Sequence, residues 1–113
     1  MYKTNEEQIN ITIDEFVDEW KDQQEYMFVD IRESEEIESN GAIKGAFNIS
    51  MYDIPEKVDM APTYITCIIL CNDGTRSEQV VKYLKNNEYN NMFFIDGGLE
   101  NLFERCPDLK VTL

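Results

Sequence analysis

At 113 residues, the chain is long enough to bury a hydrophobic core without disulfides or metals, and we expect one domain over residues 1–113. Its 10 basic and 23 acidic residues give a net charge of −13, which makes nucleic acid a poor partner and fits either a soluble acidic surface or attraction to a basic protein. The chain has three cysteines and no histidine, which argues against a disulfide framework and a zinc site and favours reduced thiols in the cytoplasm. No apolar segment comes near the roughly 20 residues that span a bilayer, which argues against a membrane protein.

The first predicted elements are a short strand and a helix. Residues 9–13 alternate between apolar and polar side chains, as a half-buried strand does. Thr12 and Glu15 have the T-x-x-E spacing of a capping box, which predicts that a helix begins there. Phe16 and Trp20 then lie on one helical stripe, so we expect them in the core and assign them no function.

A buried strand and an acidic helix follow. Residues 27–31 form a nearly continuous apolar run, typical of a strand covered on both faces, and residues 33–39 fit a short helix. Asp30 and Arg32 lie at the carboxyl end of this strand, where open α/β sheets place their sites. They also have a purely structural interpretation, as a pair with Glu36 or as a loop cap, and we favour that one.

Two glycines punctuate the next segment. Residues 41–49 predict turns followed by a third short strand at the end of the segment. Residues 52–57 predict a short helix, which we expect Pro55 to interrupt. No internal repeat or linker breaks this region.

The central feature of the chain is a loop that contains a cysteine. An apolar run at residues 67–70 leads into Cys71-Asn72-Asp73-Gly74-Thr75-Arg76-Ser77, and a helix is predicted over residues 78–87. Backbone N–H groups of such a loop, together with the helix N-terminus, form a cradle for an anion, which is either the cysteine thiolate or a substrate oxyanion. We therefore predict Cys71 as a catalytic nucleophile and the residues after it as the substrate-binding loop: Asn72, Asp73, Gly74, Thr75 and Arg76.

The other two cysteines are weaker candidates. Cys67 lies within the apolar run, so we expect it to be buried and inert. Cys106 precedes Pro107 and is a candidate for exposure, but nothing cationic or rich in glycine surrounds it. The C-x4-R spacing of Cys71 and Arg76 also closes a smaller ring than the C-x5-R of cysteine phosphatases, so the loop has room for little more than one sulfur atom.

The chain ends with a strand and a helix. Residues 92–95 predict a last buried strand, and the turn at residues 96–98 leads into a helix with three apolar side chains, Leu99, Leu102 and Phe103. The alternation of strands and helices predicts a parallel, two-sided α/β sheet in a single domain.

Several of these segments resemble the rhodanese family of sulfurtransferases. The resemblance lies in residues 29–32, 36–37, 41–49, the loop C-x-x-G-x-R-S at 71–77, and residues 96–98. Two positions depart from the family pattern, with Ala42 in place of the usual histidine and Leu102 in place of the usual tryptophan. The resemblance implies a central, mostly parallel five-stranded sheet with helices on both faces.

The resemblance also implies a mechanism without a metal or organic cofactor. The Cys71 thiolate attacks the outer sulfur of a donor such as thiosulfate, sulfite leaves, and a thiol or cyanide then removes the sulfur from the persulfide. The N–H groups of residues 72–76 hold this persulfide, and Arg76 supplies positive charge or binds the oxygens of the donor.

Two alternatives to this enzyme come from other classes. One is a rhodanese-like sulfur-relay or protein-interaction module, with a protein as sulfur acceptor and little turnover of small donors. The other, a cysteine-dependent phosphatase or arsenate reductase, is disfavoured by the C-x4-R spacing. Asp73 also has two interpretations. It either points outward into solvent, or it faces the mouth of the loop and selects neutral or protein-bound donors over thiosulfate.

Overall fold

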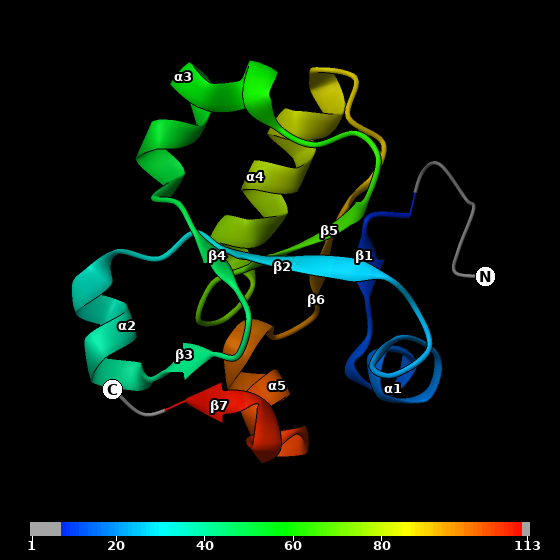
Figure 1. Cartoon of the computed structure of the whole chain (residues 1–113), viewed down its shortest axis with the longest axis vertical. Coiled ribbons are helices and arrows are strands. Elements are labelled where there is room, and N and C mark those ends of the chain that lie inside the picture. Colours follow the sequence, from blue (N-terminus) through cyan, green and yellow to red (C-terminus); the bar gives the residue numbers. More distant parts are fainter. Residues whose placement is uncertain (1–7, 112–113) are drawn as a thin grey trace.

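The computed structural model describes residues 8–111, which are organised around a parallel sheet (Figure 1). Its five strands lie in the order β1-β6-β5-β2-β4, and every neighbouring pair is parallel. The predicted parallel five-stranded α/β sheet is therefore confirmed. The strands are β1 (Asn10–Ile11), β2 (Tyr26–Asp30), β4 (Phe47–Asn48), β5 (Thr66–Leu70) and β6 (Met92–Ile95).

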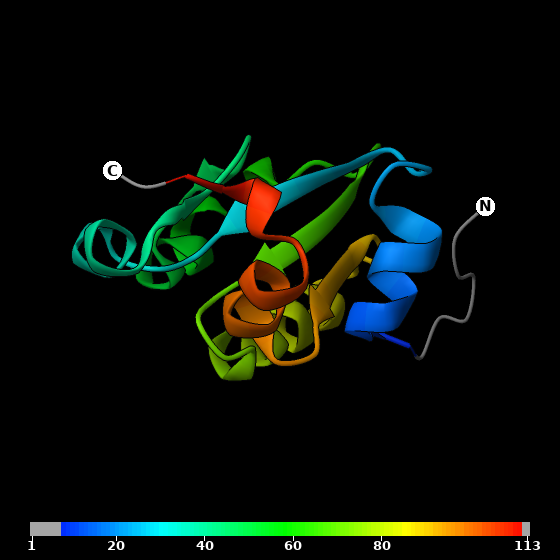
Figure 2. The ribbon, with the colours of Figure 1, turned by 90° about the horizontal axis from the view of Figure 1, so that it is seen from below.

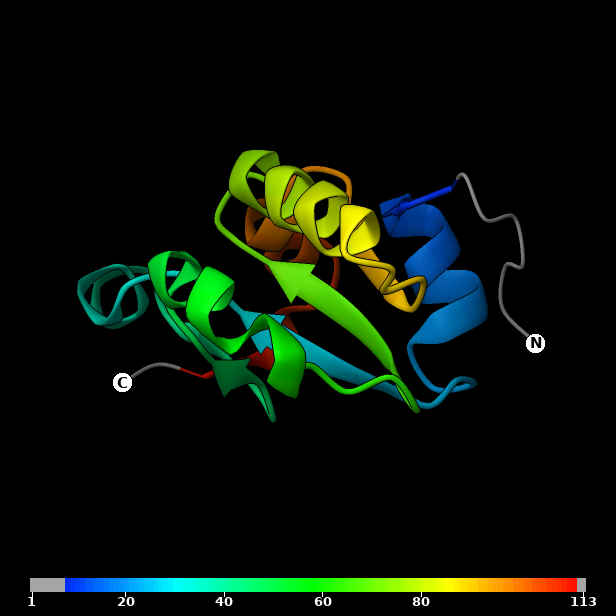
Figure 3. The ribbon, with the colours of Figure 1, turned by 90° about the horizontal axis from the view of Figure 1, so that it is seen from above.

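Helices cover both faces of this sheet. Figure 1 shows α3 (Ile54–Lys57) and α4 (Thr75–Asn86) above it, and α1 (Ile13–Glu15) and α5 (Gly98–Arg105) below it. The view from below in Figure 2 brings α5 and α1 to the front, and the view from above in Figure 3 brings α3 and α4 forward. Another helix, α2 (Ser34–Asn40), follows β2 and lies beyond the carboxyl ends of the strands.

The sheet separates two apolar clusters because successive side chains of a strand point to opposite faces. On β5, Ile68 packs in the cluster that contains Phe16 and Trp20, and its neighbour Ile69 packs in the cluster that contains Val81 of α4. Phe16 and Trp20 are fully buried, which confirms their predicted role as core residues. Burial on both faces explains why the sequences of β5 and β6 are continuous apolar runs.

The first helix begins at the predicted cap, and the strand before it is shorter than expected. The strand predicted over 9–13 ends at Ile11, because the Thr12 hydroxyl caps a helix by accepting the Glu15 N–H at 3.0 Å. This helix continues as the π-helical segment η1 (Phe16–Trp20), in which the Lys21 N–H reaches the Phe16 carbonyl at 2.8 Å.

The middle helix is not interrupted by its proline. Pro55 lies in the first turn of α3, where its missing N–H has no partner in the helix to lose. Two 3₁₀ segments, η2 (Met51–Asp53) and η3 (Val58–Met60), flank α3 on either side. The helix predicted over 78–87 starts earlier, at Thr75, so the reactive loop is shorter and tighter than expected.

A second, antiparallel sheet was not predicted. It pairs β3 (Ala42–Ile43) with β7 (Lys110–Val111), which follows the 3₁₀ segment η4 (Pro107–Leu109). Ala42, which replaces the family's usual histidine, lies opposite Val111 in this ladder. Strands of two residues have no periodicity for a sequence pattern to reveal.

Candidate active site

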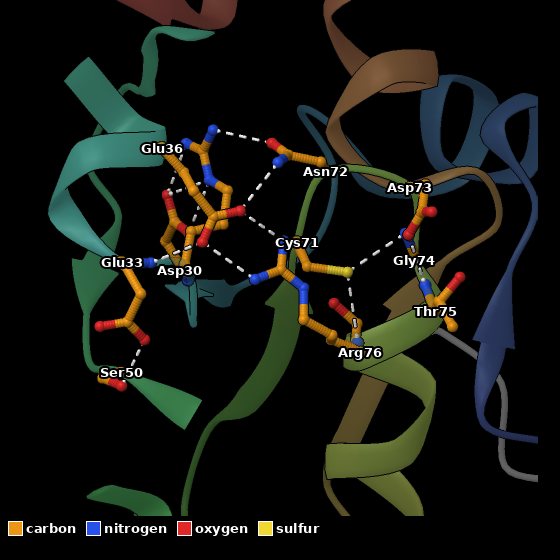
Figure 4. A network of polar contacts seen from close by, with 12 residues as sticks. Asp30, Glu33, Glu36, Ser50, Cys71, Asn72, Asp73, Gly74, Thr75 and Arg76 are labelled. Atoms are coloured by element: carbon orange, nitrogen blue, oxygen red, sulfur yellow. Dashed lines mark hydrogen bonds and ion pairs between the residues drawn. The ribbon is translucent and has the colours of Figure 1, made fainter. Parts of the chain in front are cut away.

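The thiol of Cys71 lies at the point where β5 ends and α4 begins. Its side chain is fully buried, and its Sγ accepts hydrogen bonds from the N–H groups of Gly74 at 3.2 Å and Ser77 at 3.3 Å (Figure 4). Gly74 is the N-cap of α4 and has a left-handed φ of 92°. Because this glycine has no side chain, the sulfur takes the place of a capping oxygen at the positive end of the helix.

The expected cradle is therefore present, with a different set of donors. Gly74 belongs to the range 72–76 from which N–H donors were predicted, whereas Ser77 lies one residue beyond it. Ser77 is itself buried, and its hydroxyl has no hydrogen-bond partner within residues 8–111. The sulfur thus lies in a buried turn in which two N–H groups and the N-terminal end of α4 point toward it.

The loop is held from behind by the start of α5. The carbonyls of Cys71 and Asn72 accept the N–H groups of Leu99 and Glu100, each at 2.9 Å. Gly98, with φ of 63°, lies so close that a Cβ there would be 2.5 Å from the Gly74 nitrogen and 2.6 Å from the Cys71 oxygen. The second glycine of the 96–98 turn is therefore a packing requirement of the reactive loop.

Arg76 forms a bidentate pair with a carboxylate from α2. Its two terminal nitrogens lie 3.0 and 2.7 Å from the two oxygens of Glu36, and both side chains are about 30% exposed, at 31% and 28%. The hydrogen bonds from Arg76, and then that from the Glu33 N–H, lower the pKa of Glu36 to about 2. The same ion pair raises the pKa of Arg76. This bidentate pair is charged at neutral pH and joins α2 to the first turn of α4.

Asp30 and Arg32 support the loop from inside. Both are buried, with Arg32 Nη2 at 2.8 Å from Asp30 Oδ2, which agrees with the structural role that we favoured. Arg32 also donates to Asn72 Oδ1 at 3.0 Å, and Asn72 Nδ2 donates to Glu36 Oε1 at 3.0 Å. A continuous network therefore runs from the end of β2 to Arg76 (Figure 4). Of the two structural interpretations, the loop cap is the one observed, because Asp30 Oδ1 accepts the Arg32 N–H at 3.0 Å, whereas Glu36 pairs with Arg76.

Asp73 and Thr75 lie on the solvent side of the loop. The Asp73 carboxylate accepts the Thr75 N–H at 3.0 Å, and this hydrogen bond lowers the pKa of Asp73. Both residues are exposed, and Figure 4 places Asp73 on the opposite side of Cys71 from Glu36. The outward interpretation of Asp73 therefore agrees with the structure.

The remaining cysteines are buried in the core. Burial raises the pKa of Cys67 to about 11 and also raises the pKa of Cys106. The expected exposure of Cys106 is wrong, because its side chain is 3% exposed and packs in the cluster with Trp20 and Leu102. Leu102, which replaces the family's usual tryptophan, is fully buried there.

Residues 8–111 hold neither a metal-binding cluster nor a membrane-spanning helix. No group of three or more Cys, Asp or Glu side chains in this range is arranged to hold a metal ion. None of the helices formed by these residues has both the length and the apolar character needed to cross a bilayer.

Glu36 belongs to the active site, but the sequence analysis gave it no role there. The sequence indicates it only as a candidate partner for the strand end and as part of a segment that resembles the family. The contact with Arg76 joins residues 40 positions apart, so no local pattern contains it. The one local signal is the capping arrangement, in which the Glu36 carboxylate accepts the Glu33 N–H and is thereby fixed in direction.

The family model of the rhodanese-like domain matches residues 13–104. A sulfurtransferase of Allochromatium vinosum is 32% identical over 78 residues, which are 69% of this chain and 72% of that protein. A thiosulfate sulfurtransferase of Stutzerimonas stutzeri is 28% identical over 74 residues, 66% of this chain and 67% of that protein. A tRNA uridine(34) hydroxylase of Bdellovibrio bacteriovorus is 31% identical over 97 residues, but these cover only 26% of that protein and 78% of this chain.

Solved structures show the same fold. A rhodanese-related protein of Thermoplasma volcanium has a TM-score of 0.74 at 23% identity, with 87% of this chain and 93% of that chain covered. A rhodanese-like domain protein of Staphylococcus aureus has a TM-score of 0.67 at 29% identity, with 82% and 89% covered. With the family model matching most of the chain and sulfurtransferases among its relatives, this protein belongs to the rhodanese-like domain family.

Proposed function

We propose that this protein is a sulfurtransferase that carries sulfane sulfur on Cys71, from a donor such as thiosulfate to a thiophilic acceptor such as a thiol or cyanide. The observation that supports it is the pair of N–H groups, from Gly74 and Ser77, on the cysteine Sγ at the N-terminus of α4. A thiolate there is stabilised without a general base, which suits a chain that contains no histidine.

The reaction divides into two displacements. In the first, the Cys71 thiolate forms a bond to the outer sulfur of thiosulfate, and sulfite leaves with the electron pair of the broken S–S bond. In the second, an acceptor thiolate or cyanide attacks the outer sulfur of the persulfide, and the cysteine thiolate is the leaving group. The negative charge stays on sulfur throughout, in the turn whose N–H groups and helix end are oriented before the reaction.

The C-x4-R ring and the relatives support this activity over phosphoryl transfer. Only four residues separate Cys71 from Arg76, and the relatives named above include a sulfurtransferase and a thiosulfate sulfurtransferase. The acceptor is a small thiol or, alternatively, a thiol of a partner protein.

One observation favours a second candidate, a sulfur-relay or interaction module with little turnover of small donors. The Cys71 side chain is fully buried, and Arg76 is already held by Glu36. A relative named as a hydroxylase, of which the matched region covers only 26%, is also compatible with a domain that serves a larger protein.

The intact mass of the protein after incubation with thiosulfate tests the proposal. We expect a gain of one sulfur that is lost again on addition of cyanide. Cys71→Ser should abolish the gain, whereas Cys67→Ala and Cys106→Ala, which remove buried thiols elsewhere in the core, should retain most of it. Sulfur loading in the Cys71→Ser protein would contradict the assignment of the nucleophile. A wild-type protein that stays unloaded by any sulfane donor would favour the interaction module.

A further inference from the structure

The carboxylate of Glu36 is saturated with hydrogen-bond donors. Oε1 accepts from Arg76 Nη2 at 2.7 Å and from Asn72 Nδ2 at 3.0 Å. Oε2 accepts from Arg76 Nη1 at 3.0 Å and from the Glu33 N–H at 3.0 Å. A carboxylate offers about four lone-pair sites, and here four donors occupy them. Glu36 is therefore fixed in position and ionised at neutral pH.

Because of this pair, Arg76 has less capacity to bind the oxygens of a sulfur donor. Its guanidinium presents two nitrogens to Glu36, and a sulfonate group would have to displace that carboxylate to gain the same contact. The other guanidinium of the network, Arg32, has a fully buried side chain and pairs with Asp30.

A further cation beside the loop is Lys110. It lines a cavity together with Asn72, but Glu100 lines the same cavity, and the Lys110 ammonium lies over the Phe103 ring at 5.3 Å from its centroid. The net charge of −13 adds a general repulsion of anions. The electrostatics of the site thus oppose a doubly charged donor.

We propose that Glu36 sets the donor class of this site, by neutralising Arg76 and so disfavouring dianionic thiosulfate relative to sulfane donors of lower charge, such as organic persulfides and thiosulfonates. This inference rests on the proposed function, since it concerns the donor for the Cys71 persulfide. The residue that selects the donor is then Glu36 on α2, and not Asp73 in the loop, for which the sequence analysis raised that role.

The chemistry is the same for each class of donor. With an organic persulfide R–S–SH, the Cys71 thiolate bonds to the outer sulfur, the S–S bond of the donor breaks, and the thiolate R–S⁻ leaves while the proton stays on the new persulfide. With a thiosulfonate, the leaving group is a sulfinate in place of sulfite. Methanethiosulfonate therefore presents the same outer sulfur as thiosulfate with one negative charge fewer, which makes the two a matched pair of probes.

The test compares kcat/KM for these two donors in the wild-type protein and in Glu36→Gln. We expect the wild type to prefer methanethiosulfonate. Glu36→Gln should raise kcat/KM for thiosulfate by roughly tenfold and for methanethiosulfonate by less than about threefold, because repulsion scales with donor charge. Glu35→Gln, which removes the same charge from an exposed position on the same helix, is the control and should change the ratio little.

Four outcomes are decisive. A donor ratio that Glu36→Gln leaves unchanged, in a protein that loads sulfur normally, overturns the inference and leaves the sulfurtransferase intact. An equal shift in Glu35→Gln also overturns it, because general charge would then explain the selection. Failure of every donor to load Cys71 removes the proposed function and the inference with it. Should Glu36→Gln fail to fold, the wild-type ratio decides, since a preference for thiosulfate contradicts the proposal.

Discussion

The sulfur of Cys71 and the hydroxyl of Ser77 lie in the same buried turn, yet they differ in how well they are hydrogen-bonded. The sulfur accepts two N–H groups, whereas the Ser77 Oγ has no partner within the part of the chain that the structure describes. An unsatisfied buried hydroxyl costs folding free energy. The turn therefore provides hydrogen bonds to the sulfur and leaves the Ser77 hydroxyl without one, as expected where function outweighs stability.

Replacement of this hydroxyl should not destabilise the protein. We expect Ser77→Ala to leave the free energy of unfolding unchanged or to raise it by about 1 kcal/mol, because an unsatisfied polar group is removed. Ser50→Ala is the matched control, since its hydroxyl donates to Glu33 at 2.6 Å and its loss should cost about 1 kcal/mol. Urea unfolding of the three proteins measures both values. A loss in Ser77→Ala as large as that in Ser50→Ala would mean that the Ser77 hydroxyl is satisfied after all.

The contact between α5 and the reactive loop makes a second, steric demand. Gly98 and Gly45 both have positive φ, at 63° and 78°, but a Cβ on Gly45 would meet no atom within 4 Å. Both alanine variants carry the backbone strain of about 1–2 kcal/mol, and only Gly98→Ala adds a clash with the loop backbone.

We expect Gly98→Ala to displace the loop and to lower the rate of sulfur loading of Cys71 by about 10- to 100-fold. It should also cost about 2–3 kcal/mol more stability than Gly45→Ala, which should load sulfur at the wild-type rate. Mass spectrometry of loading over time, with urea unfolding of each variant, provides the measurements. Similar loading by the two variants would show that the loop does not depend on its contact with α5.

The link between α2 and α4 predicts a dependence of stability on pH. The pKa of Glu36 falls from its ordinary 4.5 to about 2 in the folded protein. A lowered pKa means that the stabilisation is complete above pH 4.5 and disappears as the pH falls toward about 2. Solvent screening limits this contribution to about 1–2 kcal/mol.

Wild-type protein should therefore be more stable than Glu36→Gln at neutral pH, and the difference should shrink between pH 4.5 and about 2. Urea unfolding of both proteins at steps across this interval measures the difference. Glu35→Gln, with its exposed side chain on the same helix, should show no comparable convergence. A gap between wild type and Glu36→Gln that is constant with pH would contradict the ion pair as its source.

Across the whole chain, the features that local patterns contain were predictable and the long-range ones were not. The strand, loop and helix around Cys71 are contiguous, so apolar runs and glycine placement reveal them. Contacts between distant segments include the pairing of β3 with β7, the packing of Cys106 in the core and the ion pair of Glu36 with Arg76. Such contacts depend on how the elements pack, and elements of two residues have too little sequence to show a period.

The net charge of −13 leads to a prediction for the molecule as a whole. Exposed ion pairs such as Lys21–Asp108 and Lys82–Glu78 add little to stability, so repulsion among the excess carboxylates should outweigh them. Added sodium chloride should then raise the midpoint of urea unfolding at neutral pH, because salt screens the repulsion. The free energy of unfolding should rise by an amount on the order of 1 kcal/mol.

The same salt series at the isoelectric point separates this effect from general effects of salt on folding. The pI is about 4.2, and at that pH the net repulsion vanishes while opposite charges still attract. Sodium chloride should therefore leave the midpoint unchanged there or lower it. A midpoint that falls with salt at neutral pH would show that the ion pairs outweigh the repulsion. An equal rise at both pH values would attribute the stabilisation to the salt itself rather than to the acidic surface.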